Sequence, residues 1–248
     1  MQGIKKYLLN IIGIISFFSL WQIYSEIKRD ATIVSLDRIV KAFISIIKDK
    51  ALYENIGATL KILLIGIGCA IVFGITIGIL IDLCDAVKQM ITPLIELFRN
   101  IPSITLFPIL LVAFGIGDMS RIFVIFWTSA PAIILSTVYG LRTIDKTIIE
   151  ASHSFGANKL QTMWHIKLPL AMPEILNGIR IAIGSGFVAI VVAEMLGASK
   201  GLGFMVLWTT NSFKYHETYS YILIIAIIGA MANMIMSKII EHYERNLL

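Results

Sequence analysis

Charged residues are scarce in this chain: only 15% of its 248 residues are Asp, Glu, Lys or Arg. A soluble domain carries about 25% charged residues and is about 45–50% apolar. This chain is 57% hydrophobic, with a mean hydropathy of +0.85. A disordered segment would be poor in apolar residues and rich in charge. The composition therefore excludes both classes and indicates an integral membrane protein.

Cysteine and histidine are also rare. Cys69 and Cys84 lie fifteen residues apart, a spacing typical of no metal or redox site, and the four histidines show no metal-ligand spacing. The chain has no Gly-x-x-x-x-Gly-Lys-Ser/Thr phosphate loop, so it lacks the motif of an ATPase. We therefore expect no catalytic residue, no cofactor and no metal on this chain.

The apolar residues lie in uncharged windows long enough to cross a bilayer. A helix needs about 20 mostly apolar residues to span a hydrocarbon core of roughly 30 Å. Continuous apolar runs favour helices, because the strands of a membrane barrel alternate apolar and polar residues. The predicted spans are 7–25, 62–81, 100–117, 122–141, 218–237 and a shorter window, 181–193, which reaches spanning length if it begins near residue 175. We predict an all-α polytopic membrane protein with six transmembrane helices.

Three local patterns refine this prediction. Between the first two spans, apolar residues recur at helical spacing over 33–47, which predicts a surface-lying amphipathic helix. In the second span, Gly66, Ala70, Gly74 and Gly78 form a stripe of small residues on which another helix can pack closely. Prolines predict an irregular or kinked start to the third span; they are Pro93, Pro102 and Pro108.

The first span resembles a signal peptide in having lysines before it. Its apolar stretch is longer than the usual ~7–15 residues and no small-x-small cleavage site follows, so we expect it to be retained. Lysine and arginine divide almost equally between the two sides of the membrane, and the short connections favour a cytoplasmic N-terminus.

The polar connection 142–175 carries its own pattern. Two short helical segments, 147–155 and 158–165, flank Gly156, where the chain must turn. The second segment places Leu160, Met163 and Trp164 on one face. Such a helix could insert into a cleft of a partner, or it could lie on lipid headgroups, where Trp and Lys are common. Residue types alone do not separate these interpretations.

The spacing in this connection resembles the EAA loop of ABC importer permeases. That loop reads Glu-Ala-Ala, three residues, Gly, nine residues, Ile-x-Leu-Pro. The only departure here is Ser152, a small residue in place of the second alanine. The matching residues are Glu150, Ala151, Ser152, Gly156, Ile166, Leu168 and Pro169.

The resemblance extends over about 55–237. Ile101-Pro102, Pro108 and the Gly-Ile-Gly at 115–117 resemble the third span of the family and the turn after it. The segment 193–197, Ala-Glu-Met-Leu-Gly, and the Gly-Leu-Gly at 201–203 resemble the nitrate/sulfonate/taurine branch.

This resemblance implies a type I ABC importer permease fold. Residues 1–54 would hold the first transmembrane helix and an external amphipathic helix, and 55–248 the permease core with a cytoplasmic coupling loop at 142–175. The implied partners are two ATPase subunits that hold ATP and Mg²⁺, an extracytoplasmic solute-binding protein and a second permease copy in a homodimer, all at the lipid bilayer and without nucleic acid.

The implied location is the cytoplasmic membrane of a bacterium or archaeon, with both termini cytoplasmic. The implied activity is import of a small solute of the nitrate, sulfonate or taurine class, or of the vitamin-precursor class. The alternatives are an ABC permease of another branch, for methionine, polyamines or phosphate, and a secondary transporter or channel. The latter would call for inverted repeats and ionisable groups at mid-membrane, and the sequence offers neither.

The resemblance also assigns roles to the coupling loop. We expect Glu150 to anchor the loop by ion pairs or backbone caps and Gly156 to allow its turn. Pro169 would stop the loop helix before the fifth span. The side chains expected to fill a cleft of the ATPase are Leu160, Met163 and Trp164.

Polar residues near the membrane are the candidates for the solute pathway. Glu194 could line the outer entry or lie at the interface in contact with water. Glu96 and Arg99 stand three residues apart and are predicted to pair. Hydroxyls that could face a solute, or bond their own helix instead, belong to Ser103, Thr105 and Ser185.

Overall fold

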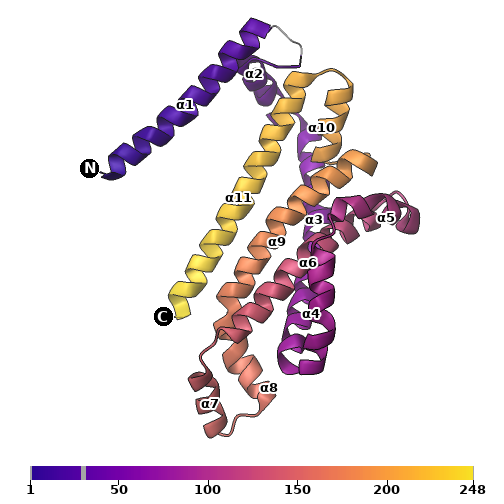
Figure 1. The fold of residues 1–248 in the computed structure, drawn as a ribbon. Coiled ribbons are helices and arrows are strands. Elements are labelled where there is room, and N and C mark those ends of the chain that lie inside the picture. Colours follow the sequence, from indigo (N-terminus) through magenta and orange to yellow (C-terminus); the bar gives the residue numbers. More distant parts are fainter. Residues whose placement is uncertain (1, 29–31, 248) are drawn as a thin grey trace.

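The computed structural model describes residues 2–28 and 32–247, and within these ranges every regular element is a helix. Figure 1 shows long helices lying side by side, with short helices at both ends of the body. In chain order they are α1 (Gln2–Lys28), α2 (Leu36–Ile47), α3 (Lys50–Leu83), α4 (Asp85–Arg99), the 3₁₀ helix η1 (Ser103–Leu106), α5 (Phe107–Phe114), α6 (Asp118–Arg142), α7 (Lys146–Ser154), α8 (Lys159–Thr162), the π-helical segment η2 (Met163–Lys167), α9 (Leu168–Gly197), α10 (Leu202–Asn211) and α11 (Tyr215–Leu247).

The predicted all-α polytopic fold is confirmed. Among the described residues, four helices are long and apolar enough to cross a membrane: α3, α6, the continuous helix Lys159–Gly197 and α11. A fifth is formed if α4 and the segment Ser103–Phe114 count as one bent span. The first predicted span, 7–25, falls in α1, and the side chains of α1 are only partly among those described.

The centre of the molecule is the packing of α3, α6 and α9. Small residues allow this close approach, as the stripe in the second span predicted. A Cβ atom on Gly66 would lie 2.7 Å from Cβ of Ile125, and one on Gly78 would lie 2.6 Å from Cβ of Thr137. The glycine stripe of α3 is therefore buried against α6 inside one subunit.

The third span begins earlier than the window predicted over 100–117. Its first half is α4, which begins fifteen residues earlier, and the chain then bends by 88° into the segment Ser103–Phe114. The bend lies at Pro102, which lacks a backbone N–H and disfavours helical geometry at the residue before it. The predicted irregularity is confirmed, whereas the helix before it was missed.

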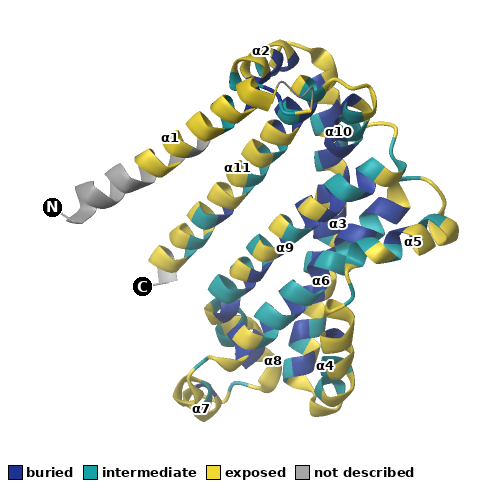
Figure 2. Ribbon diagram, turned by 45° about the horizontal axis from the view of Figure 1, so that its top comes forward, coloured by how far each residue is buried: buried dark blue, intermediate teal, exposed yellow. Residues whose placement is uncertain are grey.

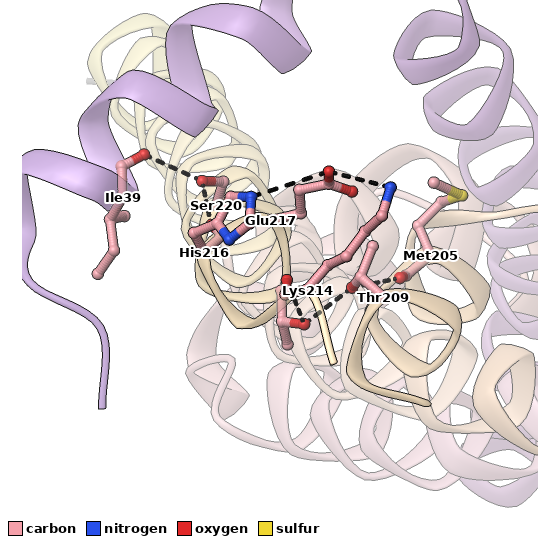
Figure 3. A network of polar contacts seen from close by, with 8 residues as sticks. Ile39, Met205, Thr209, Lys214, His216, Glu217 and Ser220 are labelled. Carbon is pink, nitrogen blue, oxygen red and sulfur yellow. Dashed lines mark hydrogen bonds and ion pairs between the residues drawn. The ribbon is translucent and has the colours of Figure 1, made fainter. Parts of the chain in front are cut away.

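The amphipathic helix predicted over 33–47 is present as α2. Its buried residues are Ile39, Ala42 and Ile46. Figure 3 shows how it is held: the hydroxyl of Ser220 on α11 donates to the carbonyl of Ile39 at 3.1 Å. The short helix α10, which the sequence did not predict, precedes α11 at the same end of the body (Figure 1).

Candidate functional site

The connection between α6 and α9 forms a helical hairpin at one end of the molecule (Figure 1). Asp145 caps α7 by accepting from the backbone N–H of Thr147 at 2.9 Å. The chain then turns at Gly156, whose φ of +84° lies in the left-handed region that favours glycine. A reciprocal capping box between Asn158 and Gln161 starts α8. The turn expected at Gly156 is therefore present, with a defined cap on each side.

The two arms of this hairpin are tied together through Ser152, the residue that departs from the EAA pattern. Its hydroxyl lies 3.1 Å from that of Thr162 and also donates to the carbonyl of Ile149 at 2.7 Å. Both hydroxyl-bearing residues are buried. The serine thus uses its extra oxygen to join α7 to α8.

The hairpin presents an apolar tip. Phe155 is 93% exposed, Leu160 60% and Trp164 58%, and Figure 2 shows that the surface of α7 is mostly exposed. Phe155 was missed: the sequence places it at the end of the predicted helical segment 147–155, whereas α7 ends at Ser154 and leaves Phe155 in the turn. Glu150 and Ala151 are also exposed, and the Glu150 carboxylate has no hydrogen bond or ion pair within the described protomer. We define the side chains of Phe155, Leu160 and Trp164 as the hairpin tip.

Met163 does not belong to this tip. It is 1% exposed and packs in a cluster with Leu141, Ala171 and Ile175. The predicted partner-facing role of Met163 is therefore wrong. The helical spacing places it beside Leu160 and Trp164, but the segment lies with Met163 towards the base of α6 and α9.

The role predicted for Pro169 is also wrong. The helix does not stop there, because α8, η2 and α9 are continuous from Lys159 to Gly197. The π-helical geometry of η2 precedes the proline, which lacks a backbone donor. Ile166 and Leu168, the other residues of this part of the motif, are half-buried at the junction.

An ion pair fixes the base of the hairpin. Lys167 pairs with Asp82 at the end of α3, and both side chains are largely buried. The pair joins the end of the hairpin to a helix that runs to the opposite end of the molecule. A displacement of the hairpin would therefore act directly on α3.

The opposite end of α3 meets Glu194. This residue is 1% exposed in the described protomer. It therefore neither lines an entry nor lies in contact with water, and both predicted positions for Glu194 are wrong. Its carboxylate accepts from the hydroxyl of Thr59 at 2.8 Å and from the backbone N–H of Gly203 at 2.8 Å. The Thr59 oxygen in turn accepts from the N–H of Leu202 at 2.9 Å, and Asn55 accepts from that of Gly201 at 2.7 Å. These contacts bind the turn between α9 and α10 to α3.

The Gly-Leu-Gly of this turn has a steric cause. Gly201 has φ +125°, and a Cβ there would lie 2.3 Å from Cδ of Glu194. A Cβ on Gly203 would lie 2.0 Å from the carbonyl oxygen of Val191. The close approach of the carboxylate and the backbone therefore requires glycine at both positions.

A cavity of 480 Å³ lies where the third span bends. The bend contributes Arg99, Asn100 and Ser103, and α6 and α9 form the other walls. The predicted pathway residues Ser103 and Ser185 line it together, although the Ser185 hydroxyl donates to carbonyls of its own helix. Thr105 does not line it, and instead donates to the carbonyl of Pro102 at 2.6 Å. The side chains from α6 and α9 that line this cavity, which we call the bend cavity, are those of Trp127, Thr128, Pro131, Ala132, Leu135, Ile181 and Ser185.

Arg99 is exposed in this cavity, and the predicted ion pair with Glu96 is absent from the described part of the chain. A cation at the C-terminus of a helix gains about 0.3–1 kcal/mol from the helix dipole. A charged side chain at mid-bilayer costs about 2.5–3.5 kcal/mol on insertion scales, unless it faces water or a partner. The helix end alone therefore does not account for an arginine here.

The comparisons with known proteins agree with these features. Residues 70–248 match the family described as "Binding-protein-dependent transport system inner membrane component". The chain is 33% identical over 186 residues to the taurine transport system permease protein TauC of Escherichia coli (strain K12), covering 75% of this chain and 68% of that protein. It is 31% identical over 191 residues to the nitrate import permease protein NrtB of Leptolyngbya laminosa, covering 77% and 68%.

A further relative spans the whole chain. The bicarbonate transport system permease protein CmpB of Synechococcus elongatus (strain ATCC 33912 / PCC 7942 / FACHB-805) is 28% identical over 265 residues, covering 100% of this chain and 94% of that protein. Among solved structures, an inward-facing form of the MetNI methionine ABC transporter has a TM-score of 0.70 at 21% identity, covering 78% of this chain and 96% of that chain. At that identity the likeness concerns the fold.

Proposed function

Because this chain belongs to the family of binding-protein-dependent transport system inner membrane components and is the permease subunit of an ABC importer, we propose that it moves a small oxyanion or sulfonate inward as one half of a permease homodimer. Two ATPase subunits, which hold ATP and Mg²⁺, would drive the movement. An extracytoplasmic binding protein would deliver the solute. The single observation that carries the proposal is the similarity to permeases named for taurine, nitrate and bicarbonate.

The ATPase would dock on the hairpin tip. Exposed aromatic and aliphatic side chains on a rigid, capped hairpin suit insertion into an apolar cleft. Phe155 and Trp164 supply the largest exposed apolar surfaces, and the unpaired Glu150 carboxylate nearby is free to pair with a basic residue of the partner. This surface supports the docking interpretation over a helix lying on lipid, because Phe155 projects from the turn whereas Leu160 and Trp164 lie on the helix after it, so the hairpin tip is not a single helical face.

The orientation follows from this docking. If the hairpin between α6 and α9 is cytoplasmic, α9 runs outward, the turn with Glu194 and α10 lies outside, and α11 returns inward. Tracing the chain back through α6, the bent span, α3 and α1 then also places the N-terminus inside. Both termini would be cytoplasmic, in a multi-pass protein of the inner membrane.

The solute class is proposed from the chemistry that the named relatives share. Taurine carries a sulfonate, and nitrate and bicarbonate are oxyanions, so all three present negatively charged oxygens. A permease for this class needs positive charge and hydrogen-bond donors along its pathway. The shared oxygen chemistry favours an oxyanion or sulfonate over a vitamin precursor.

The helix α3 would transmit the movement. At its cytoplasmic end the Asp82–Lys167 pair attaches it to the hairpin, and at its outer end Thr59 and Asn55 hold the turn before α10. Closure of the ATPase dimer would bring the two hairpins together, and α3 would move with α6 and α9 as a rigid body. The result would be a change from inward-open to outward-open.

Purification in mild detergent tests this proposal. The chain would be co-expressed with the ATPase and binding protein encoded with it, and ATP hydrolysis would be measured with and without solute-loaded binding protein. We expect a stable complex whose hydrolysis rises when the loaded binding protein is added. Recovery of the permease without any ATPase, together with uptake driven by an ion gradient alone, would support a secondary transporter instead.

A further inference from the structure

We propose that the bend cavity is a transient binding site for the oxyanion group of the solute, with Arg99 as the charge that holds it. This inference rests on the proposed function, because it names the place along the pathway where the charged end of the solute would be held. It assigns a role to a residue that the sequence alone places at the edge of a span.

The position of the cavity supports a place on a pathway. Thr128 and Pro131 lie near the middle of α6, and Ile181 and Ser185 lie near the middle of α9. The cavity is therefore at mid-height of two helices that cross the membrane. α4 reaches this depth because its fifteen residues rise about 22 Å from the end of α3.

The charge of the cavity is unbalanced. Arg99 is exposed to it, and none of the described residues that line it is Asp or Glu. No ion pair to Arg99 is formed anywhere in the described protomer. An arginine at this depth needs water or an anion, and no described carboxylate of this chain supplies the anion. An oxyanion passing through the cavity satisfies that requirement.

The hydrogen-bonding groups also suit an anion. A guanidinium presents its N–H groups in a planar fork that matches two oxygens of a carboxylate-like or sulfonate group. Ser103 lies on the same wall. Trp127 lines the cavity too, and its indole N–H is the one buried side-chain donor without a partner among the described residues. Three other lining side chains donate to backbone carbonyls, those of Asn100, Thr128 and Ser185. The donors left to face the cavity are therefore those of Arg99 and Ser103, and they suit an anion and not a cation.

The cavity also has the size of a passage site. At 480 Å³ it lies within the roughly 300–1,000 Å³ of small-molecule sites, and it therefore leaves room for water around a solute as small as nitrate. A site on a pathway must bind weakly enough to release its solute. One arginine with a few neutral groups meets that condition better than a cage of several charges.

The test uses the complete importer in liposomes, with the binding protein outside and ATP available to the ATPase. Uptake of radiolabelled taurine, nitrate and bicarbonate is measured together with ATP hydrolysis. In Arg99→Gln we expect the solute moved per ATP to fall about tenfold or more, with assembly and hydrolysis unchanged, since a charge-assisted pair is lost. Arg99→Lys keeps the charge and loses the planar fork of the guanidinium. The solute that it moves per ATP should lie between the values for Arg99→Gln and the wild type.

Lys88→Gln is the matched control, because Lys88 is on the same helix and outside the cavity. It should transport like the wild type. The proposal is overturned if Arg99→Gln moves solute at the wild-type ratio, if it loses assembly and hydrolysis together with uptake, or if the wild type takes up none of the three probes. Each of these results leaves the recovery of an ATPase, which tests the proposed function, as a separate observation.

Discussion

The hydroxyl of Thr59 donates a 2.8 Å hydrogen bond to the carboxylate of Glu194, which lies 135 residues further along the chain. Both residues are buried, at 0% and 1% exposure, and the same hydroxyl accepts from the N–H of Leu202. One oxygen atom therefore joins three segments: α3, the end of α9 and the start of α10. Its removal would leave a donor and a carboxylate oxygen unsatisfied in the interior.

Substitution of this hydroxyl tests the contact. Thr59→Val keeps the shape of the side chain and removes both hydrogen bonds, so we expect a loss of about 1–3 kcal/mol for each buried group left unsatisfied. Thr59→Ser keeps the hydroxyl and is the control. Thermal unfolding in detergent should show a clearly lower midpoint for Val than for Ser. Equal midpoints would mean that the bond to Glu194 contributes nothing measurable.

The left-handed turn of the hairpin gives the second prediction. A Cβ at Gly156 meets no atom within 4 Å, so a substitution there acts through backbone strain alone. Residues other than glycine lose about 1–2 kcal/mol in this conformation, and asparagine loses least. We expect Gly156→Val to hydrolyse ATP with reduced uptake, and Gly156→Asn to retain more uptake. Normal uptake by Gly156→Val would contradict the role of this turn in coupling.

Substitutions of the neighbouring residues Met163 and Trp164 should have different effects, one on stability and the other on ATPase binding. Trp164 is exposed and Met163 is buried, so Trp164→Ala should weaken recovery of the ATPase with little change in thermal stability. Met163→Ala should lower stability by about 2–5 kcal/mol, the usual cost of truncating a buried Met to Ala. Pull-down of the ATPase and thermal unfolding of the permease, measured on both variants, separate the two effects. The opposite assignment of effects would show that the hairpin packs differently.

The cap of α7 predicts a pH dependence. The backbone N–H of Thr147, donating to Asp145, lowers the pKa of that carboxyl from its usual value of 3.8. A lowered folded-state pKa means that the cap contributes fully above pH 3.8 and is lost as pH falls through the lower folded value. Amide exchange of α7 should therefore rise in acid more steeply than that of α8, whose cap is the neutral Asn158.

Asp145→Asn is the control for this effect. Asparagine also caps helices but does not titrate, so α7 in this variant should lose the acid-dependent rise. If the wild type and the variant exchanged identically between pH 2 and 5, the charge of Asp145 would have no part in holding α7.

Several features of this protein follow from residue order alone. Spans such as 62–81 and 122–141 are predictable because lipid admits only long apolar helices, and the amphipathic helix follows from the spacing of its apolar residues. The turn at Gly156 is predictable because the pattern around it is local. These features depend on residues that are neighbours in sequence, and no packing is needed to find them.

Other features depended on how distant helices cross. Helical spacing places Met163 on one face with Leu160 and Trp164. Met163 is buried because it packs against residues of α6 and α9 that are not its neighbours in sequence. The sequence predicts that Glu194 lies at the membrane interface or the outer entry. In the structure it is buried and accepts a hydrogen bond from Thr59 of α3.

The surroundings of Arg99 also depend on the tertiary structure. This residue reads as the edge of a span until the chain bends by 88° and brings it to one cavity with Ser185. Spacing along one helix tells which residues share a face. What that face meets is decided by helix packing, because the close approach of α3, α6 and α9 selects which side chains are enclosed and which are left to face the cavity.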